Sequence, residues 1–172
     1  QNFEEIDLVV CNFYPFDKVL KITNNNDKIV ENIDVGGPTM VRAAAKNYKN
    51  VTVISSCDDY ENLLNELKLW KGSTSLTFRR KMSEKAFMET GSYDASIFNY
   101  FSKVSKHIYP EKKFIVSTKV EELRYGENPH QTGAIYSLNE NQKIKQLHGK
   151  MLSYNNYNDI YSALLISKSL PK

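Results

Sequence analysis

The chain has 172 residues, of which 41% are hydrophobic and 25% are charged, the balance of a globular protein that can bury a core. Its 23 basic and 20 acidic residues are spread along the sequence, so composition argues against a nucleic-acid or membrane-surface partner. No apolar run approaches the roughly 20 residues of a membrane helix, and from the opening residues we expect no signal peptide.

The cysteines and histidines do not suggest a metal site. Cys11 and Cys57 are the only cysteines, neither belongs to a C-x-x-C pair, and the three histidines are scattered. We therefore predict two free thiols in a cytoplasmic protein and no metal. Gln1 is not an initiator methionine, and the helix-like run before Leu170 is unfinished, so a fragment of a longer protein is expected.

Two short apolar runs in the first part of the chain predict strands. Residues 6–11 (IDLVVC) and 51–55 (VTVIS) are continuous runs, typical of strands buried on both faces in a parallel sheet. Tyr14 precedes a proline, which places a loop after the first strand. Together with the helices between and after them, these runs predict an α/β fold.

Helices are predicted around these strands. Residues 28–33 favour a short helical or irregular stretch, and a Gly-Gly turn precedes a helix over 40–46, with Pro38 in its first helical position. Asp58 or Asp59 can cap a further helix that runs to about Trp70.

The second half begins with a helical pattern over about 75–106, with a break expected at Gly91. Composition then changes, and a domain junction is expected near 110–120. Beyond it, residues 134–138 predict a strand and 160–168 the beginning of a helix.

A first group of polar residues surrounds the first strand and the glycine turn. Asn12 and Tyr14 follow the strand, Asp34 precedes the turn, and Lys46 comes later in the helix. Ligands of α/β sheets bind beyond the carboxyl ends of strands, and helix N-termini favour anions. An acid, a phenol and an amine there could share proton transfer and charge stabilisation. On spacing alone, a turn, a helix cap and a solvated lysine are the preferred explanation of these residues.

A second group lies in residues 124–131. Arg124 could hold a phosphate and Tyr125 could stack on a heterocycle, although a loop of turn-forming residues explains the pattern as well. Residues 148–156 contain Ser153 before a helix, and capping is the preferred interpretation there.

Four segments together resemble the bifunctional phosphoribosylaminoimidazolecarboxamide formyltransferase and inosinate (IMP) cyclohydrolase family. They are DLVVCNFYPF at 7–16, ENIDVGGPTMVRAAAKNYKNVTVI at 31–54, LRYGENPHQTGAIY at 123–136 and QLHGKMLSYNN at 146–156. The resemblance implies that residues 1–116 are the latter part of a methylglyoxal-synthase-like cyclohydrolase domain. Residues 117–172 would begin a cytidine-deaminase-like formyltransferase domain.

The resemblance also implies site residues. Tyr14, Asp34 and Lys46 match the family's cyclohydrolase catalytic residues. The matching nucleotide-contacting positions are Cys11, Asn12, Asp34, Val35 and Gly36 in the first domain, and Arg124 and Tyr125 in the second.

The implied reactions are closure of the inosinate ring with loss of water, and formyl transfer from 10-formyltetrahydrofolate, whose site would lie mostly outside this chain. The family further implies a small-molecule nucleotide substrate and a homodimer of the intact protein, with no nucleic acid or membrane. A binding-only phosphate or nucleotide sensor is the alternative, although it would not require Tyr14, Lys46 or the 123–131 segment. A generic scaffold would leave the clustering of polar loops unexplained.

Overall fold

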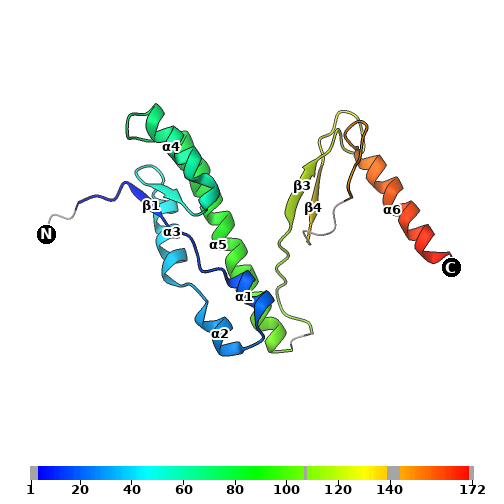
Figure 1. Ribbon diagram of the computed structural model, residues 1–172, viewed down its shortest axis with the longest axis horizontal. Coiled ribbons are helices and arrows are strands. Elements are labelled where there is room, and N and C mark those ends of the chain that lie inside the picture. The colour runs from blue at the N-terminus through cyan, green and yellow to red at the C-terminus, as the bar shows by residue number, and fades with distance from the viewer. Residues whose placement is uncertain (1–3, 107, 139–143, 171–172) are drawn as a thin grey trace. The chain divides into compact units, whose positions relative to one another are not determined.

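The computed structural model describes residues 4–106, 108–138 and 144–170. The chain divides into two compact units, 1–114 and 115–172. Among the described residues, unit 1 combines several helices with a two-stranded sheet and unit 2 combines one helix with a two-stranded sheet; the elements are labelled in Figure 1. This arrangement confirms the predicted mixture of α and β structure. No helix in the described ranges is long and apolar enough to cross a membrane.

The sheet of unit 1 pairs β1 (Leu8–Val10) with β2 (Thr52–Ile54). The strands are parallel and in register, with Leu8 opposite Thr52 and Val10 opposite Ile54. The backbone N–H of Cys11 donates to the carbonyl of Ile54 at 2.9 Å and extends the ladder beyond the strand. The predicted parallel pairing is therefore confirmed, and the loop after β1 leaves from the carboxyl edge of the sheet.

The two strands differ in burial. Every residue of β2 is buried, as predicted. In β1 only Val9 packs against the core, whereas Leu8 is 39% exposed and Val10 46% exposed. The prediction of burial on both faces is wrong for β1, because within the described residues the core covers one face of this strand and leaves the other open.

Three helices connect β1 to β2: α1 (Phe16–Ile22), α2 (Asn26–Glu31) and α3 (Gly36–Lys46). Both glycines of the expected turn lie inside α3, and Pro38 is its third residue rather than its first. The helix begins early because the Asp34 carboxylate accepts the backbone N–H of Gly37. Pro38 is tolerated there because first-turn N–H groups have no partner within the helix.

The chain after β2 forms a short 3₁₀ turn (Cys57–Asp59) and then α4 (Tyr60–Leu69). Asp59 occupies the N-cap position of α4, as predicted, but its side chain accepts no backbone N–H of the helix. Ser56 accepts the N–H of Asp58 in the preceding 3₁₀ turn. Asp59 is buried, and its carboxylate lies 2.6 Å from the ammonium of Lys85.

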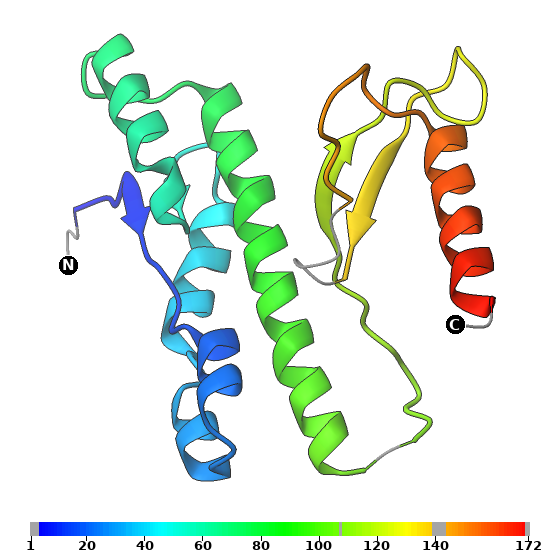
Figure 2. The same ribbon diagram turned by 45° about the vertical axis from the view of Figure 1, so that its right-hand side comes forward.

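Helix α5 (Leu76–Val104) is continuous, so the predicted break at Gly91 is wrong. A helical glycine costs only about 1 kcal/mol relative to alanine, and buried residues on both sides of it, Ala86 and Ala95, hold the two halves in place. Figure 2 shows α5 running beside α3. The core of unit 1 lies where α3, β2 and α5 meet, with Val41, Ile54 and Ala86 among its fully buried residues.

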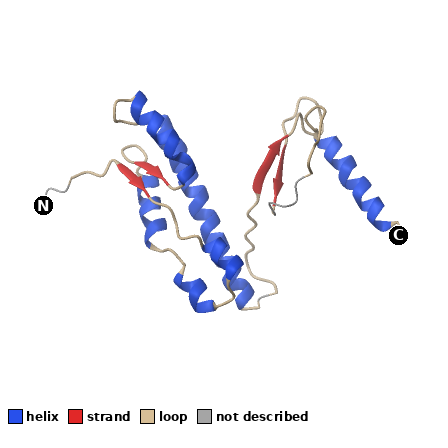
Figure 3. Ribbon diagram, viewed as in Figure 1, coloured by secondary structure: helices blue, strands red, loops and turns tan. Residues whose placement is uncertain are grey.

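Unit 2 pairs β3 (Thr118–Glu122) with β4 (Ala134–Ser137) in an antiparallel hairpin and continues to α6 (Tyr154–Ser169), as Figure 3 shows. The strand predicted at 134–138 is confirmed. Helix α6 begins before the expected start at Ile160, because Ser153 and Asn156 form a capping box at its N-terminus. The capping interpretation of residues 148–156 is therefore confirmed for Ser153.

Candidate functional site

The Asp34 carboxylate joins the loop after β1 to the start of α3. Its Oδ1 accepts the backbone N–H of Gly37 at 2.8 Å, and its Oδ2 accepts the backbone N–H of Tyr14 at 3.3 Å. A Cβ added at Gly37 would lie 2.6 Å from Oδ2, so only glycine leaves room for the carboxylate in this position. The structure thus brings the backbone of Tyr14 to the Asp34 carboxylate, which is held by backbone N–H groups from two segments.

The surroundings of this carboxylate are open to solvent. The side chain of Tyr14 is 57% exposed and Val35 is 72% exposed. A Cβ added at Gly36 would meet nothing within 4 Å. The N-terminus of α3 therefore offers free space next to a held carboxylate, in which a polar ligand could reach the backbone N–H groups of the first turn.

Cys11 and Asn12 line the same loop. Burial, followed by the negative charge of Asp34, raises the pKa of the Cys11 thiol, which keeps it protonated and unsuited to act as a nucleophile. The amide of Asn12 donates to the hydroxyl of Tyr60 at 2.8 Å and to the sulfur of Cys57 at 3.3 Å. These contacts anchor the loop to the start of α4.

Lys46 lies apart from this group. It is the last residue of α3 and is exposed, whereas Asp34 precedes the first residue of that helix. At about 1.5 Å of rise per residue, the helix axis between Gly36 and Lys46 is about 15 Å long. Within the described part of the chain, no hydrogen bond or ion pair joins Lys46 to Asp34 or Tyr14.

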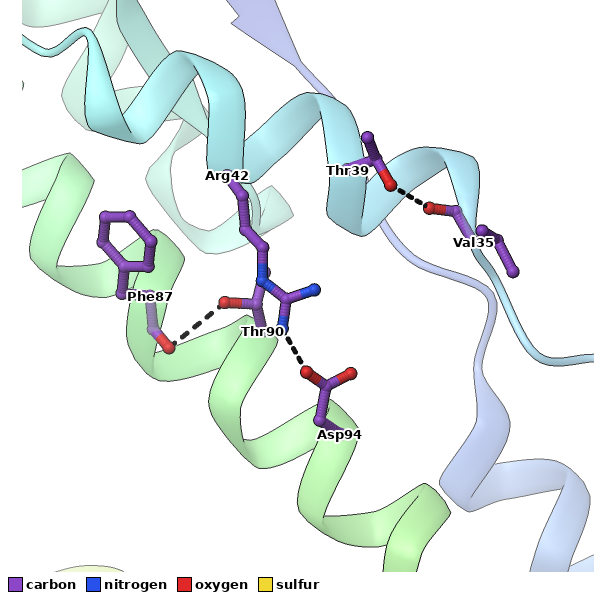
Figure 4. A network of polar contacts seen from close by, with 6 residues as sticks. All are labelled: Val35, Thr39, Arg42, Phe87, Thr90 and Asp94. Carbon is purple, nitrogen blue, oxygen red and sulfur yellow. Dashed lines mark hydrogen bonds and ion pairs between the residues drawn. The ribbon is translucent and has the colours of Figure 1, made fainter.

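A surface ion pair joins α3 to α5 (Figure 4). The guanidinium of Arg42 on α3 pairs with the carboxylate of Asp94 on α5. Thr39 donates its hydroxyl to the carbonyl of Val35 at 2.7 Å in the first turn. One residue before Asp94, the hydroxyl of Tyr93 accepts the backbone N–H of Asp34 at 2.8 Å.

Sequence reasoning missed Tyr60 and Tyr93 as neighbours of the site. Both hydroxyls reach the candidate residues from elements distant in sequence, namely α4 and α5. Tyr93 lies in the helical pattern predicted over about 75–106, where an aromatic residue indicates core packing. No local pattern distinguishes a tyrosine hydroxyl that bonds to a backbone group 59 positions away.

In unit 2, Arg124 and Tyr125 stack on one another. The guanidinium carbon of Arg124 lies 4.9 Å from the ring centroid of Tyr125, and its Nη2 donates to the tyrosine hydroxyl at 3.3 Å. Hydrogen bonding to Ser153, and then to Arg124, lowers the pKa of Tyr125. The backbone N–H of Tyr154 donates to the carbonyl of Tyr125 at 3.2 Å, which places the pair at the N-terminus of α6.

The loop after Tyr125 is held by its own polar groups. The N–H of Gly126 donates to the carbonyl of Gln131 at 2.8 Å, and the amide oxygen of Gln131 accepts the N–H of Asn128 at 2.9 Å. A Cβ at Gly126 would lie 3.0 Å from that of Gln131, so a side chain there would have to push Gln131 aside by a few tenths of an ångström. A loop of turn-forming residues, the alternative given for residues 124–131, therefore accounts for this part of the segment. The guanidinium of Arg124 is exposed and has no acidic partner among the described residues.

Comparison with known proteins identifies the family. The model of the AICARFT/IMPCHase bienzyme family matches residues 44–172, which is more than half of the chain. The chain belongs to this family. Among similar proteins, the bifunctional purine biosynthesis protein PurH of Listeria welshimeri is 44% identical and covers 96% of this chain, while the chain covers 34% of that protein. The PurH proteins of Elusimicrobium minutum and Clostridioides difficile are also 44% identical to this chain. Their alignments cover 92% and 95% of this chain, and 31% and 32% of the respective PurH proteins.

The chain therefore spans about a third of the length of these AICARFT/IMPCHase relatives. A solved structure titled "Crystal structure of ForH" is 39% identical and aligns with a TM-score of 0.45, covering 56% of this chain and 50% of that chain.

Proposed function

We propose that the intact protein completes the purine ring. It would close the formylated aminoimidazole carboxamide ribonucleotide to inosinate and make that substrate by formyl transfer from 10-formyltetrahydrofolate. The observation that carries the proposal is the 44% identity to proteins named bifunctional purine biosynthesis protein PurH over nearly the whole chain. The open carboxylate site at the start of α3 supports it, because ring closure needs an acid–base group beside a polar nucleotide.

Ring closure forms one bond and releases one water. The carboxamide nitrogen attacks the formyl carbon and gives up one proton, and the formyl oxygen takes up negative charge and then one proton to become a hydroxyl. The formamide nitrogen then gives up its proton, and the hydroxyl takes a second proton and leaves as water, which forms the carbon–nitrogen double bond of the ring. The site must therefore accept protons at nitrogen and supply them at oxygen.

Asp34 is proposed to orient the carboxamide nitrogen and accept its proton. Its carboxylate is held by the N–H groups of Tyr14 and Gly37, so its position is set before substrate binds. The exposed phenol of Tyr14 would stabilise the oxyanion and protonate the leaving hydroxyl. Lys46 is retained as the third catalytic residue from the family resemblance. Since α3 separates it from Asp34, it would have to act on a different part of the bound nucleotide.

Nucleotide contacts are proposed for both units. In unit 1 they would come from Cys11, Asn12, Val35 and Gly36. In unit 2 they would come from Arg124, whose exposed guanidinium suits a phosphate, and from the adjacent Tyr125.

Residues 1–116 are proposed as the latter part of a methylglyoxal-synthase-like cyclohydrolase domain. Residues 117–172 are proposed as the start of a cytidine-deaminase-like formyltransferase domain. The intact protein is proposed to be a cytoplasmic homodimer whose partners are small molecules.

Binding without catalysis is the second candidate function. The position of Lys46 at the far end of α3 favours it, because a nucleotide sensor needs only the open N-terminus of the helix.

The two candidates are separated by giving the formylated ribonucleotide to the full-length protein and following inosinate formation by absorbance. Product formation supports the enzyme, and a Lys46→Met variant then tests the lysine. Binding of the nucleotide without product supports the sensor and rejects the cyclohydrolase.

A further inference from the structure

The hydroxyl of Tyr93 bridges two backbone groups in the segment that carries Asp34. It accepts the N–H of Asp34 at 2.8 Å and donates to the carbonyl of Asn32 at 3.3 Å. Burial, above all, raises the pKa of this phenol, so its proton stays in place at neutral pH and the donated bond is maintained. A single side chain from α5 therefore fixes both ends of the turn that leads into α3.

The ring of Tyr93 contacts the other half of the site. Its centroid lies 5.4 Å from that of Phe13, in the loop between Asn12 and Tyr14, and 6.0 Å from that of Phe16. Phe16 is almost fully buried and begins α1, so the ring is held against a rigid element. The hydroxyl thus fixes the Asp34 segment while the ring supports the Tyr14 loop.

These contacts converge on the carboxylate. Asp34 is bonded through its own N–H to Tyr93, and through its side chain to the N–H groups of Tyr14 and Gly37. Without the tyrosine hydroxyl, the Asp34 N–H and the Asn32 carbonyl would lose their shared partner in a partly buried position, and the segment could shift. A shift of about 1 Å at a reacting group can cost about a hundredfold in rate.

We propose that Tyr93 is a positioning residue for the ring-closing site, acting through Asp34 rather than on the substrate. The inference rests on the proposed function. It means that a residue of α5 holds the segment leading into α3 in place. Asp94, the next residue of α5, pairs with Arg42 on α3, so neighbouring residues of one helix hold both the entry and the middle of α3 (Figure 4).

The test uses the full-length protein with Tyr93→Phe and a matched control, Tyr100→Phe. Tyr100 is on the same helix, its ring also packs on Phe16, and its hydroxyl bonds to Asn26 rather than to the Asp34 segment. We expect Tyr93→Phe to lower kcat for inosinate formation at least tenfold with KM changed less than threefold, and Tyr100→Phe to change kcat less than twofold. Equal effects of the two variants would overturn the proposal.

A double variant separates positioning from an independent contribution. If Tyr93 acts through Asp34, then Asp34→Asn combined with Tyr93→Phe closes the ring no more slowly than Asp34→Asn alone. If the fold-reductions in rate of the two single variants multiply in the double variant, Tyr93 acts independently of Asp34.

Failure of the proposed function is recognised separately, because the wild-type protein would then form no inosinate. In that case the positioning role is tested by the hydrogen-exchange rate of the Asp34 backbone amide in the two tyrosine variants. Exchange at least tenfold faster in Tyr93→Phe than in Tyr100→Phe supports the positioning role, and equal exchange refutes it.

Discussion

Replacing Gly37 by alanine perturbs the Asp34 carboxylate directly, because the three atoms nearest to the new Cβ all belong to Asp34. The new Cβ would lie 2.6 Å from Oδ2, 3.0 Å from Cγ and 3.1 Å from Oδ1. Normal contacts require several tenths of an ångström more, so the carboxylate must swing away and release the N–H groups of Gly37 and Tyr14. Since Asp34 is partly solvated, we expect this loss to cost about 1–2 kcal/mol.

Gly36→Ala is the matched control. It adds the same methyl group one residue earlier in the same helix, where nothing lies within 4 Å. Both variants gain about 0.5–1 kcal/mol from the more restricted unfolded chain, so this gain cancels in the comparison.

Urea unfolding of unit 1, followed by the fluorescence of the single tryptophan, Trp70, measures both variants. We expect Gly37→Ala to be less stable than Gly36→Ala by about 1–2 kcal/mol. Equal stability, or a more stable Gly37→Ala, would refute the close packing of Asp34 against α3.

Two further predictions concern buried polar groups. Asp59→Asn removes the counter-charge of the Lys85 ammonium. The side chain of Asp59 is 6% exposed and that of Lys85 is 29% exposed, so the ammonium keeps part of its hydration and unit 1 should lose about 1–2 kcal/mol in the same assay; a loss below about 0.5 kcal/mol would contradict the ion pair. Burial and the hydrogen bond to Glu121 raise the pKa of Tyr157 from 10.0 to about 12. The unfolded chain therefore loses this proton first, and stability should fall between about pH 10 and pH 12 by up to about 1.4 kcal/mol per pH unit. Tyr157→Phe should show a shallower fall by urea titration, and an unchanged slope would count against the raised pKa.

The parallel pairing of unit 1 could be predicted because its signals are local. A continuous apolar run of β-branched residues, as in β2, favours a buried strand, and an intervening helical segment favours a parallel partner. The exposed outer face of β1 could not be predicted, because the same run suits a strand covered on one face or on both. Strand β3 (TKVEE) went unpredicted because its charged residues carry little strand signal.

The residues whose roles could not be predicted from the sequence are those whose roles depend on tertiary contacts. Gly91 favours a break in the helix, but packing on both sides of it keeps α5 continuous. Asp59 has a capping tendency, yet burial beside Lys85 sets its role instead. The contact of Tyr93 with Asp34 bridges α5 and the start of α3, which no periodicity encodes. The separation of Lys46 from Asp34 follows from helix rise, once α3 is known to be unbroken.

Ring closure by an Asp34→Asn variant of the intact protein tests the central claim most directly. Asparagine keeps the size of the side chain and one acceptor oxygen but cannot take a proton from the carboxamide. We expect inosinate formation to fall at least a hundredfold, while the dissociation constant for inosinate, measured by calorimetry, changes less than fivefold. Turnover equal to that of the wild-type protein would show that the carboxylate held between Tyr14 and Gly37 does not perform the chemistry.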